Sequence, residues 1–564
     1  MSLFSSIRMA ANALRANEIG LQVVGQNIAN ANTPGYIREE LVLTPAPTQA
    51  MGSLQLGMGV NVKAVVQKID SFLEGRLRSA VSDSSSAQAQ EAAYQQLESL
   101  INEMGDNDIS TQLDSFFSSI SNILNQPESS SVRNLAVLQG GTLTEAIQNL
   151  TSQVTQLRED ANQRIVSMAG DINRLTEQIR RLNVQIAAAE GGDISQSDAV
   201  GLRDERLSAL QDLAKLVNIR VEEQPSGSVT VYCGGTYLVA DGVSRPVEAV
   251  LDSDRGMTVA NIQVAETDFP VEASGGELYG LLQSRDKILG GFTDSLNEFS
   301  QTLIYEFNKI YSAGQGLSGY DQVTSEFAVD GPNLALNKAG LKYTPVNGSF
   351  QVMTRATATG LTSTHDINVD LNGVGDDTTL SDLVDQLNEI PGLTAKINTQ
   401  NKLEITASSG EEFSFAGDTS GLLAALGINT FFKGSGASDI GVSDAVRGDP
   451  TKFAASLGGI GQDTQNAVTL ANFLDLPLDS KSGASLGDLY DRLTAGTTQA
   501  SSIAQSTSKS AQSFEETLRG QEAAISGVSI DEEAVQMLTY QRAYQAAARY
   551  ISVLSDLFDI LVQI

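Results

Sequence analysis

The sequence predicts an α+β multidomain fold: an elongated chain with a terminal α-helical, coiled-coil-type bundle, a rod domain of long helices, and an inserted, mainly-β outer domain. Three observations predict it. Both chain ends carry narrow apolar seams of the coiled-coil type. A longer seam of the same kind lies inside the chain, and between the helical stretches the hydrophobic period changes to two, as in strands. The 564 residues suffice for about three to five domains.

The N-terminal seam predicts a helix over roughly the first 31 residues. Apolar residues recur there at alternating steps of four and three, with one polar exception, Asn17. The seam consists of Leu3, Ile7, Ala10, Leu14, Asn17, Leu21, Val24, Ile28 and Ala31.

The C-terminal seam alternates by three and four without exception, and Ser529 with Glu532 predicts a capping box at the start of its helix. Its members are Met537, Tyr540, Tyr544, Ala547, Ile551, Leu554, Phe558 and Leu561. Each seam alone could be the core face of an ordinary helix. Two seams at opposite chain ends favour pairing with each other or with another subunit.

The charge distribution supports association at the ends. With 36 Lys and Arg against 68 Asp and Glu, the formal net charge is −32, which disfavours binding to nucleic acids or anionic membranes. Residues 1–75 nevertheless hold five basic and five acidic residues, and are formally neutral. Repulsion between copies of the chain is therefore weakest there.

A third, longer seam predicts the helical rod. It runs over 143–190 with four-three alternation and one extra four-residue step, a stutter, and it ends at Gly191-Gly192. Such a helix would be roughly 65 Å long. A second helix is expected near 203–218, and another near 278–311.

The β material is expected in the middle of the chain. Alternating apolar residues around Gly234-Gly235 predict a hairpin. Further strands are expected near 350–354 and 367–371, a short capped helix at 379–389, and a strand pair around 399–401. Helix is expected to resume from about 450.

These patterns divide the chain into three predicted domains. Residues 1–75 with 515–564 form the terminal helical domain. Residues 76–325 with 446–514 form the rod domain, with a β segment at about 219–274. Residues 326–445 form the β-rich inserted domain.

The sequence offers little that could support catalysis. Cys233 is the only cysteine and His365 the only histidine, so a cysteine or histidine metal cluster and an intramolecular disulfide are excluded. No phosphate-binding glycine motif is complete. We therefore predict a protein that is not an enzyme and has no cofactor. The N-terminus shows no cleaved signal and no stretch reads as a membrane span.

Two terminal motifs carry a resemblance to a known family. The first is the run from Asn27 to Tyr36, NIANANTPGY, in which Pro34-Gly35 fits a type II turn. The second is GVSIDEE at 527–533 followed by YQRAYQA at 540–546. Together they resemble the terminal motifs of flagellar rod, hook and hook-associated axial proteins. The long helix and the segments 203–239 and 275–292 resemble the hook-associated members at the junction between hook and filament.

The resemblance implies a structural subunit of the extracellular bacterial flagellum. It would form the junction zone between hook and filament and would be exported by the type III apparatus without a cleaved signal. The implied partners are further copies in a helical homo-oligomer, the hook protein, a filament-side junction protein, and an export chaperone at the C-terminal helix, with no nucleic acid and no membrane. The implied subunit contacts are the two motifs and seams: Ile7, Leu14, Leu21, Val24, Ile28, Asn30, Thr33, Pro34, Gly35 and Tyr36, with Met537, Tyr540, Tyr544, Ala547, Ile551, Leu554, Phe558 and Leu561.

Two alternative functions stay open at the level of sequence. A hook or distal rod protein would share both terminal motifs. A secreted, adhesin-like surface protein would use the 326–445 insert as a binding head.

Overall fold

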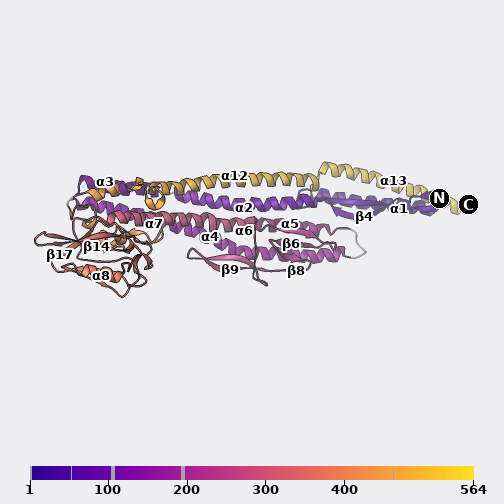
Figure 1. The fold of residues 1–564 in the computed structure, drawn as a ribbon. Coiled ribbons are helices and arrows are strands. Elements are labelled where there is room, and N and C mark those ends of the chain that lie inside the picture. The colour runs from indigo at the N-terminus through magenta and orange to yellow at the C-terminus, as the bar shows by residue number, and fades with distance from the viewer. Residues whose placement is uncertain (1–2, 52–53, 103–107, 192–196, 462, 564) are drawn as a thin grey trace. The chain divides into compact units, whose positions relative to one another are not determined.

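The computed structural model describes residues 3–51, 54–102, 108–191, 197–461 and 463–563. It is an α+β fold of long helices and small antiparallel sheets, as predicted (Figure 1). The chain groups into two units. Unit 1 comprises Met1–Ala93, Glu159–Asp286 and Ser502–Ile564; unit 2 comprises Tyr94–Arg158 and Lys287–Ser501. None of the described helices has the length and apolarity of a membrane span.

The two ends of the chain pair within unit 1. Helix α1 (Leu3–Asn30) lies antiparallel to α13 (Ile530–Gln563), with both termini at the same end of the pair (Figure 1). Phe4 meets Phe558 edge to face, with ring centroids 5.8 Å apart. The predicted terminal helices are therefore confirmed, and each provides cover for the other.

A β segment that the sequence did not suggest follows α1. Strand β1 (Glu39–Pro45) pairs antiparallel with β4 (Val60–Gln67), and β2 (Gln49–Met51) pairs with β3 (Leu54–Leu56). Prolines and glycines interrupt the period-two pattern here, so that only 60–64 alternates clearly. Helix α2 (Ser71–Asn102) comes next, and its first turns pack Leu73 and Leu77 against Leu518 of α12 (Leu486–Ser526).

The main core of unit 1 joins a helix pair to two sheets. The C-terminal part of α4 (Ser130–Glu190) and α5 (Val200–Leu216) pack against β5 (Arg220–Glu223), β6 (Val229–Cys233), β7 (Thr236–Ala240) and β8 (Val243–Ser244). The second sheet contains β9 (Val247–Asp254), β10 (Met257–Val264) and β11 (Phe269–Pro270), and α6 (Gly276–Gln283) follows. The predicted hairpin at Gly234-Gly235 is confirmed.

Three asparagines of α4 fix the sheets to the helix. Asn183 donates to the Val229 carbonyl at 2.8 Å and accepts from the Val229 N–H at 3.0 Å. Asn173 pairs in the same way with Val247, at 2.7 and 2.8 Å. Asn162 donates to Thr258 O and accepts from Ala260 N–H. Each amide replaces a neighbouring strand, because its donor and acceptor are spaced like those of a peptide group.

Unit 2 contains an aromatic core. Helices α3 (Ile109–Asn125), α7 (Gly290–Ser312) and α11 (Gln465–Ala471) surround it. Phe307 lies 5.1 Å from Phe432 and Phe116 lies 5.2 Å from Phe431, measured between ring centroids. Gly140 of α4 lies against these rings, since a Cβ there would come within 2.6 Å of Phe431. Gly140 is part of α4. The helix starts at Ser130, earlier than the start near residue 143 that the apolar seam predicted.

The predicted inserted strands and helix are present in unit 2. Strand β13 (Gly348–Ala356) pairs with β14 (Thr362–Val369) and β17 (Glu411–Ala416), while β16 (Leu403–Ala407) pairs with β15 (Leu393–Ile397) and β12 (Gln322–Thr324). Helix α8 (Leu380–Asn388) has the expected Thr379–Asp382 capping box. Further short elements are α9 (Leu422–Leu426), β18 (Phe432–Lys433), β19 (Gly441–Val442) and α10 (Asp444–Gly448), together with 3-10 helices at Leu336–Lys338, Pro450–Lys452, Phe473–Asp475 and Asp479–Lys481.

Two sequence predictions about helices need correction. The predicted 278–311 helix is interrupted by a π-helical segment at Ser284–Leu289. Continuous helix from about 450 is wrong, because only short pieces occur before α12 begins at Leu486. Pro450, Pro477 and the glycines at 458, 459 and 461 interrupt helical hydrogen bonding there.

Replacing Asn183 tests the amide anchoring of the sheets. The side chain is fully buried and also accepts from Arg206 at 3.1 Å. Asn183→Ala would leave both Val229 backbone groups without partners, so we expect a loss of roughly 3 kcal/mol in the free energy of unfolding. Urea unfolding followed by circular dichroism measures it. Gln185→Ala, an exposed position on the same helix, is the control and should stay within about 0.5 kcal/mol.

Candidate functional site: the joint of the chain ends

The covered face of α13 contains most of the predicted C-terminal seam. Between Ala534 and Ile560, the buried and half-buried side chains are Met537, Tyr540, Ala543, Ala547, Ile551, Leu554 and Phe558. Leu554 is buried, whereas Tyr544 is 39% exposed. Leu561 lies outside the described side chains.

The N-terminal seam is only partly covered. Val24 is buried, while Ile7, Leu14, Leu21 and Ile28 are half-buried. The side chains buried most deeply sit mainly one position earlier along the helix: Ser6, Ala10, Ala16, Gly20, Val23, Val24 and Asn27. The α1 face that contacts its own chain is therefore rotated relative to the predicted seam.

The N-terminal motif forms the turn that the sequence indicated. Tyr36 N–H donates to Thr33 O at 3.2 Å and Gly35 has a φ of +79°, as a type II turn requires. Asn30 donates from its side chain to Gln26 O at 3.1 Å, and Thr33 Oγ1 donates to Asn30 Oδ1 at 3.2 Å. Pro34 and Gly35 are exposed.

Asn27 ties the end of α1 to both β1 and α13. Its amide donates to Glu39 O at 3.0 Å and to Glu533 Oε2 at 3.1 Å. Its oxygen accepts from Glu39 N–H at 3.0 Å and from Tyr36 Oη at 2.8 Å. Asn27 is 1% exposed, so the turn, strand and helix are fixed by one buried side chain.

Arg38 joins α12 to α13. Its backbone N–H donates to Ser526 O, the last residue of α12, at 2.9 Å. Its guanidinium binds Glu532 at 2.8 Å and Glu533 at 2.7 Å, in the first turn of α13. The Glu533 side chain is 0% exposed, so Arg38 supplies the counter-charge to a carboxylate without access to water.

Burial shifts the acidity of the neighbouring groups. It is the main cause that raises the pKa of Tyr36, and the carboxylates of Glu39, Asp204 and Glu533 raise it further. Burial also raises the pKa of Glu39. Tyr36, which is neutral at physiological pH even at its ordinary pKa, therefore stays a hydrogen-bond donor to Asn27 at still higher pH.

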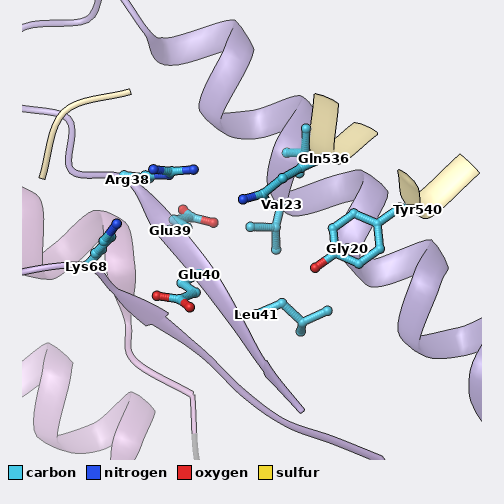
Figure 2. A pocket seen from close by; sticks show the side chains of 10 residues that line it. Gly20, Val23, Arg38, Glu39, Glu40, Leu41, Lys68, Gln536 and Tyr540 are labelled. Carbon is cyan, nitrogen blue, oxygen red and sulfur yellow. The ribbon is translucent and has the colours of Figure 1, made fainter. Parts of the chain in front are cut away.

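A pocket of about 180 Å³ lies beside this joint, between α1, β1 and α13, with Lys68 after β4 closing one side (Figure 2). Its lining is Gly20, Val23, Val24, Arg38, Glu39, Glu40, Leu41, Lys68, Gln536 and Tyr540. The ring of Tyr540 covers Gly20, where a Cβ would lie 2.8 Å from ring carbons. The charges along its wall are mixed, and among the described residues no group of three or more His, Cys, Asp or Glu is arranged to hold a metal ion.

Asn27 and the acidic run 531–533 belong to the two terminal motifs, but neither they nor Arg38 was among the predicted contact residues. The signal in the sequence that could have found them is a polar residue next to an apolar seam. Asn27 interrupts an apolar face, and Glu533 is the only acidic residue of its run that points inward.

Loss of the Arg38 side chain should detach the start of α13. Arg38→Gln leaves the Glu533 carboxylate buried with its charge uncompensated, which costs about 3–5 kcal/mol. Hydrogen exchange in residues 530–545 should accelerate accordingly. Glu532→Gln is the control, because the Glu532 side chain is 63% exposed and an exposed pair contributes about 0–1 kcal/mol. Equal effects of the two variants would contradict this account of the joint.

Two glycines of α1 offer a matched pair. Gly20→Ala would push the Tyr540 ring away and weaken the α1–α13 contact by about 1–3 kcal/mol. Gly25→Ala meets open space and should stabilise the helix by about 0.5–1 kcal/mol. Thermal unfolding monitored by circular dichroism separates the two. A stabilising Gly20→Ala would show that the ring contact is loose.

Comparison with known proteins agrees with the geometry of the ends. The model for the flagellar hook-associated protein FlgK helical domain matches residues 94–327. The model for the flagella basal body rod protein matches residues 7–36, and that for the flagellar basal body rod FlgEFG protein C-terminal region matches residues 523–564. The two terminal matches cover most of α1 with its turn, and all of α13.

Full-length relatives extend this similarity to nearly the whole chain. Flagellar hook-associated protein 1 of Escherichia coli (strain K12) is 25% identical, over 99% of this chain and 100% of its own length. Its counterpart in Bacillus subtilis (strain 168) is 25% identical, over 99% of this chain and 97% of its own. The flagellar hook junction protein FlgK of Burkholderia pseudomallei aligns with a TM-score of 0.49 and 15% identity, over 80% of this chain and 100% of that one.

These matches agree with the terminal motifs in excluding an enzyme and in placing the chain among extracellular axial components of the flagellum, which assemble with hook and filament proteins. The chain is thus similar over nearly its whole length to flagellar hook-associated protein 1, and its function is that of a structural protein of the hook–filament junction.

Proposed function

We propose that this chain builds the junction by assembling with further copies of itself through its terminal helices. Contacts between identical subunits that do not close into a ring generate a helical array. The residues that contact other copies would be the half-buried N-terminal seam, the N-terminal motif and the outer face of α13, while the C-terminal seam would hold α13 on α1 of the same chain. The exposed apolar face of α13 is the observation that carries this proposal.

The outer face of α13 is apolar although α1 does not cover it. Its members lie between 39 and 64% exposed: Val535, Leu538, Tyr550, Val553, Leu557 and Ile560. Their spacing places them on a stripe that flanks the covered face: Tyr550 and Leu557 lie one turn before and one turn after Leu554, and the other four lie further round the helix. The covered and uncovered faces give α13 two apolar stripes, and a helix with two stripes requires more than one partner.

The outer face of α1 is different. Its exposed positions include Arg8, Arg15, Glu18, Gln22 and Gln26, which are polar. Its half-buried seam, from Ile7 to Ile28, remains accessible along one edge. A neighbouring α13 could cover that edge while its own seam stays on its own α1.

We also propose individual partners, based on the place of the junction between hook and filament. We assign the hook protein to one end of the assembled zone and a filament-side junction protein to the other. Before assembly, the apolar outer face of α13 needs cover, and an export chaperone with a hydrophobic groove would supply it. Export through the flagellar type III apparatus would then deliver the chain outside the cell.

Charge on the outer face of α13 should abolish assembly without unfolding the monomer. The double variant Val553→Glu with Leu557→Glu places two carboxylates on an exposed surface. The free energy of unfolding of the monomer, measured with urea, should therefore change by no more than about 0.5 kcal/mol. Burial of those charges between subunits should prevent association. Sedimentation velocity of the purified chain at high concentration measures self-association, and motility of cells carrying the variant measures junction formation.

The control is Gln541→Glu with Ser552→Glu, which adds the same charge at exposed polar positions of α13. It should leave association and motility largely unchanged. Normal association of the Val553 and Leu557 variant would remove the outer face from the assembly surface.

A further inference from the structure

Another pocket of unit 1 lies between the start of α2, helix α5 and the paired strands β5 and β6. Its volume is about 150 Å³, and a cavity of this volume accommodates a molecule about as large as benzene. Part of its wall is aliphatic and consists of Ile69, Leu207, Leu210, Val221 and Val229. Ile69 is 39% exposed, so the pocket meets solvent on that side.

A charged pair on α2 supplies a polar part of the wall. The Glu74 side chain is 3% exposed, and neither of its carboxylate oxygens has a hydrogen-bond partner among the described residues. Gln211 approaches the carboxylate without reaching hydrogen-bond geometry. The Arg78 guanidinium, one turn further along α2, lies 3.7 Å from Glu74 Oε2, which is longer than a hydrogen bond.

Both members of this pair are poorly solvated. Burial raises the pKa of Glu74 and lowers the pKa of Arg78, because each charged form loses contact with water. A buried carboxylate without hydrogen bonds is costly to the folded chain. A molecule that supplied those hydrogen bonds would therefore gain affinity from the contact.

The other arginines of the pocket already have partners. Arg203 is bound by Glu190 at 2.7 Å and by Glu223 at 2.8 Å. Arg206 donates to the Gly227 carbonyl at 2.6 Å. An occupant of the pocket would therefore form its main polar contacts with the carboxylate and the guanidinium on α2.

The chemistry of this pair selects the kind of occupant. A carboxylate only accepts hydrogen bonds and a guanidinium only donates them, so the occupant must offer a donor and an acceptor side by side. An anion would be repelled by Glu74, and a cation by Arg78. A primary amide is neutral and carries both functions on adjacent atoms. The aliphatic wall suits a short branched body on that amide.

We propose that this pocket binds a neutral primary amide with a short branched aliphatic body, whose NH2 group donates to Glu74 and whose carbonyl accepts from Arg78. Binding satisfies the buried carboxylate and fills the aliphatic part of the pocket. The amide is either a free small molecule or the glutamine side chain of another copy of the chain, and both present the same chemistry.

The first test is a titration of the full-length chain with isobutyramide, followed by saturation-transfer NMR of the probe. We expect a dissociation constant of about 1 mM or lower. The ketone 3-methylbutan-2-one has the same shape and keeps the carbonyl but lacks the donor, so it should bind about tenfold more weakly or worse. Equal binding of amide and ketone, or no amide binding at about ten times the expected constant, would overturn the proposal.

Substitutions test the role of the carboxylate. Glu74→Leu removes the acceptor at similar volume, so the affinity for isobutyramide should fall about tenfold or more while that for the ketone changes little. Glu205→Gln, at an exposed position of α5, is the control and should bind the amide like the unaltered chain. An unchanged amide affinity in Glu74→Leu would contradict the assigned contact. If circular dichroism shows that this variant is misfolded, the comparison of amide and ketone on the unaltered chain still decides.

Sedimentation velocity of the chain with and without saturating isobutyramide separates the two sources of the amide. Weaker self-association in its presence would identify a glutamine of another copy as the occupant. Unchanged self-association, together with binding of the probe, would identify a free small molecule. Both results support an amide site, and neither depends on whether the outer face of α13 is the assembly surface.

Discussion

The structure depends on a single kind of contact, in which an amide side chain on a helix pairs with both backbone groups of one strand residue. Asn27 pairs in this way with Glu39, Asn173 with Val247 and Asn183 with Val229. In unit 2, Asn388 pairs with Ala395 and Asn308 with Phe432. Small sheets have many unpaired edges, and buried backbone groups need partners. The amides supply those partners, which allows sheets of two to four strands to sit against long helices.

At the joint of the chain ends, the same contact is combined with a buried charge. Asn27 pairs with the strand and also reaches Glu533, whose other oxygen is bound by Arg38. Buried ion pairs contribute little net stability, since desolvation offsets most of the attraction. They do penalise every arrangement in which one partner is missing. The joint therefore selects one register between α1 and α13 more strongly than it stabilises the pair.

That register divides the apolar surface of the terminal helices. Alignment of Asn27 with Glu533 and of Gly20 with Tyr540 brings one stripe of α13 onto α1 and leaves the other stripe exposed. The face of α1 that serves this contact is offset by about one position from its strict heptad seam. The seam remains half-buried as a result. Apolar surface left uncovered in the monomer is available for the proposed assembly with further copies of the chain.

The sequence by itself determined the elements that depend on local patterns. The terminal helices, the capped helix at 380–388, the hairpin at Gly234-Gly235 and the Pro34-Gly35 turn follow from periodicity, capping and turn chemistry within a few residues. The terminal motifs also carried the resemblance to flagellar axial proteins. The three-domain division and the seam contacts remain predictions. The tertiary structure alone decided which face of α1 is buried and which polar residues lie inside. Asn27, Arg38 and Glu533 acquire their roles from partners up to 506 positions away, and no local pattern distinguishes a buried asparagine or glutamate from one that ends a helix in water.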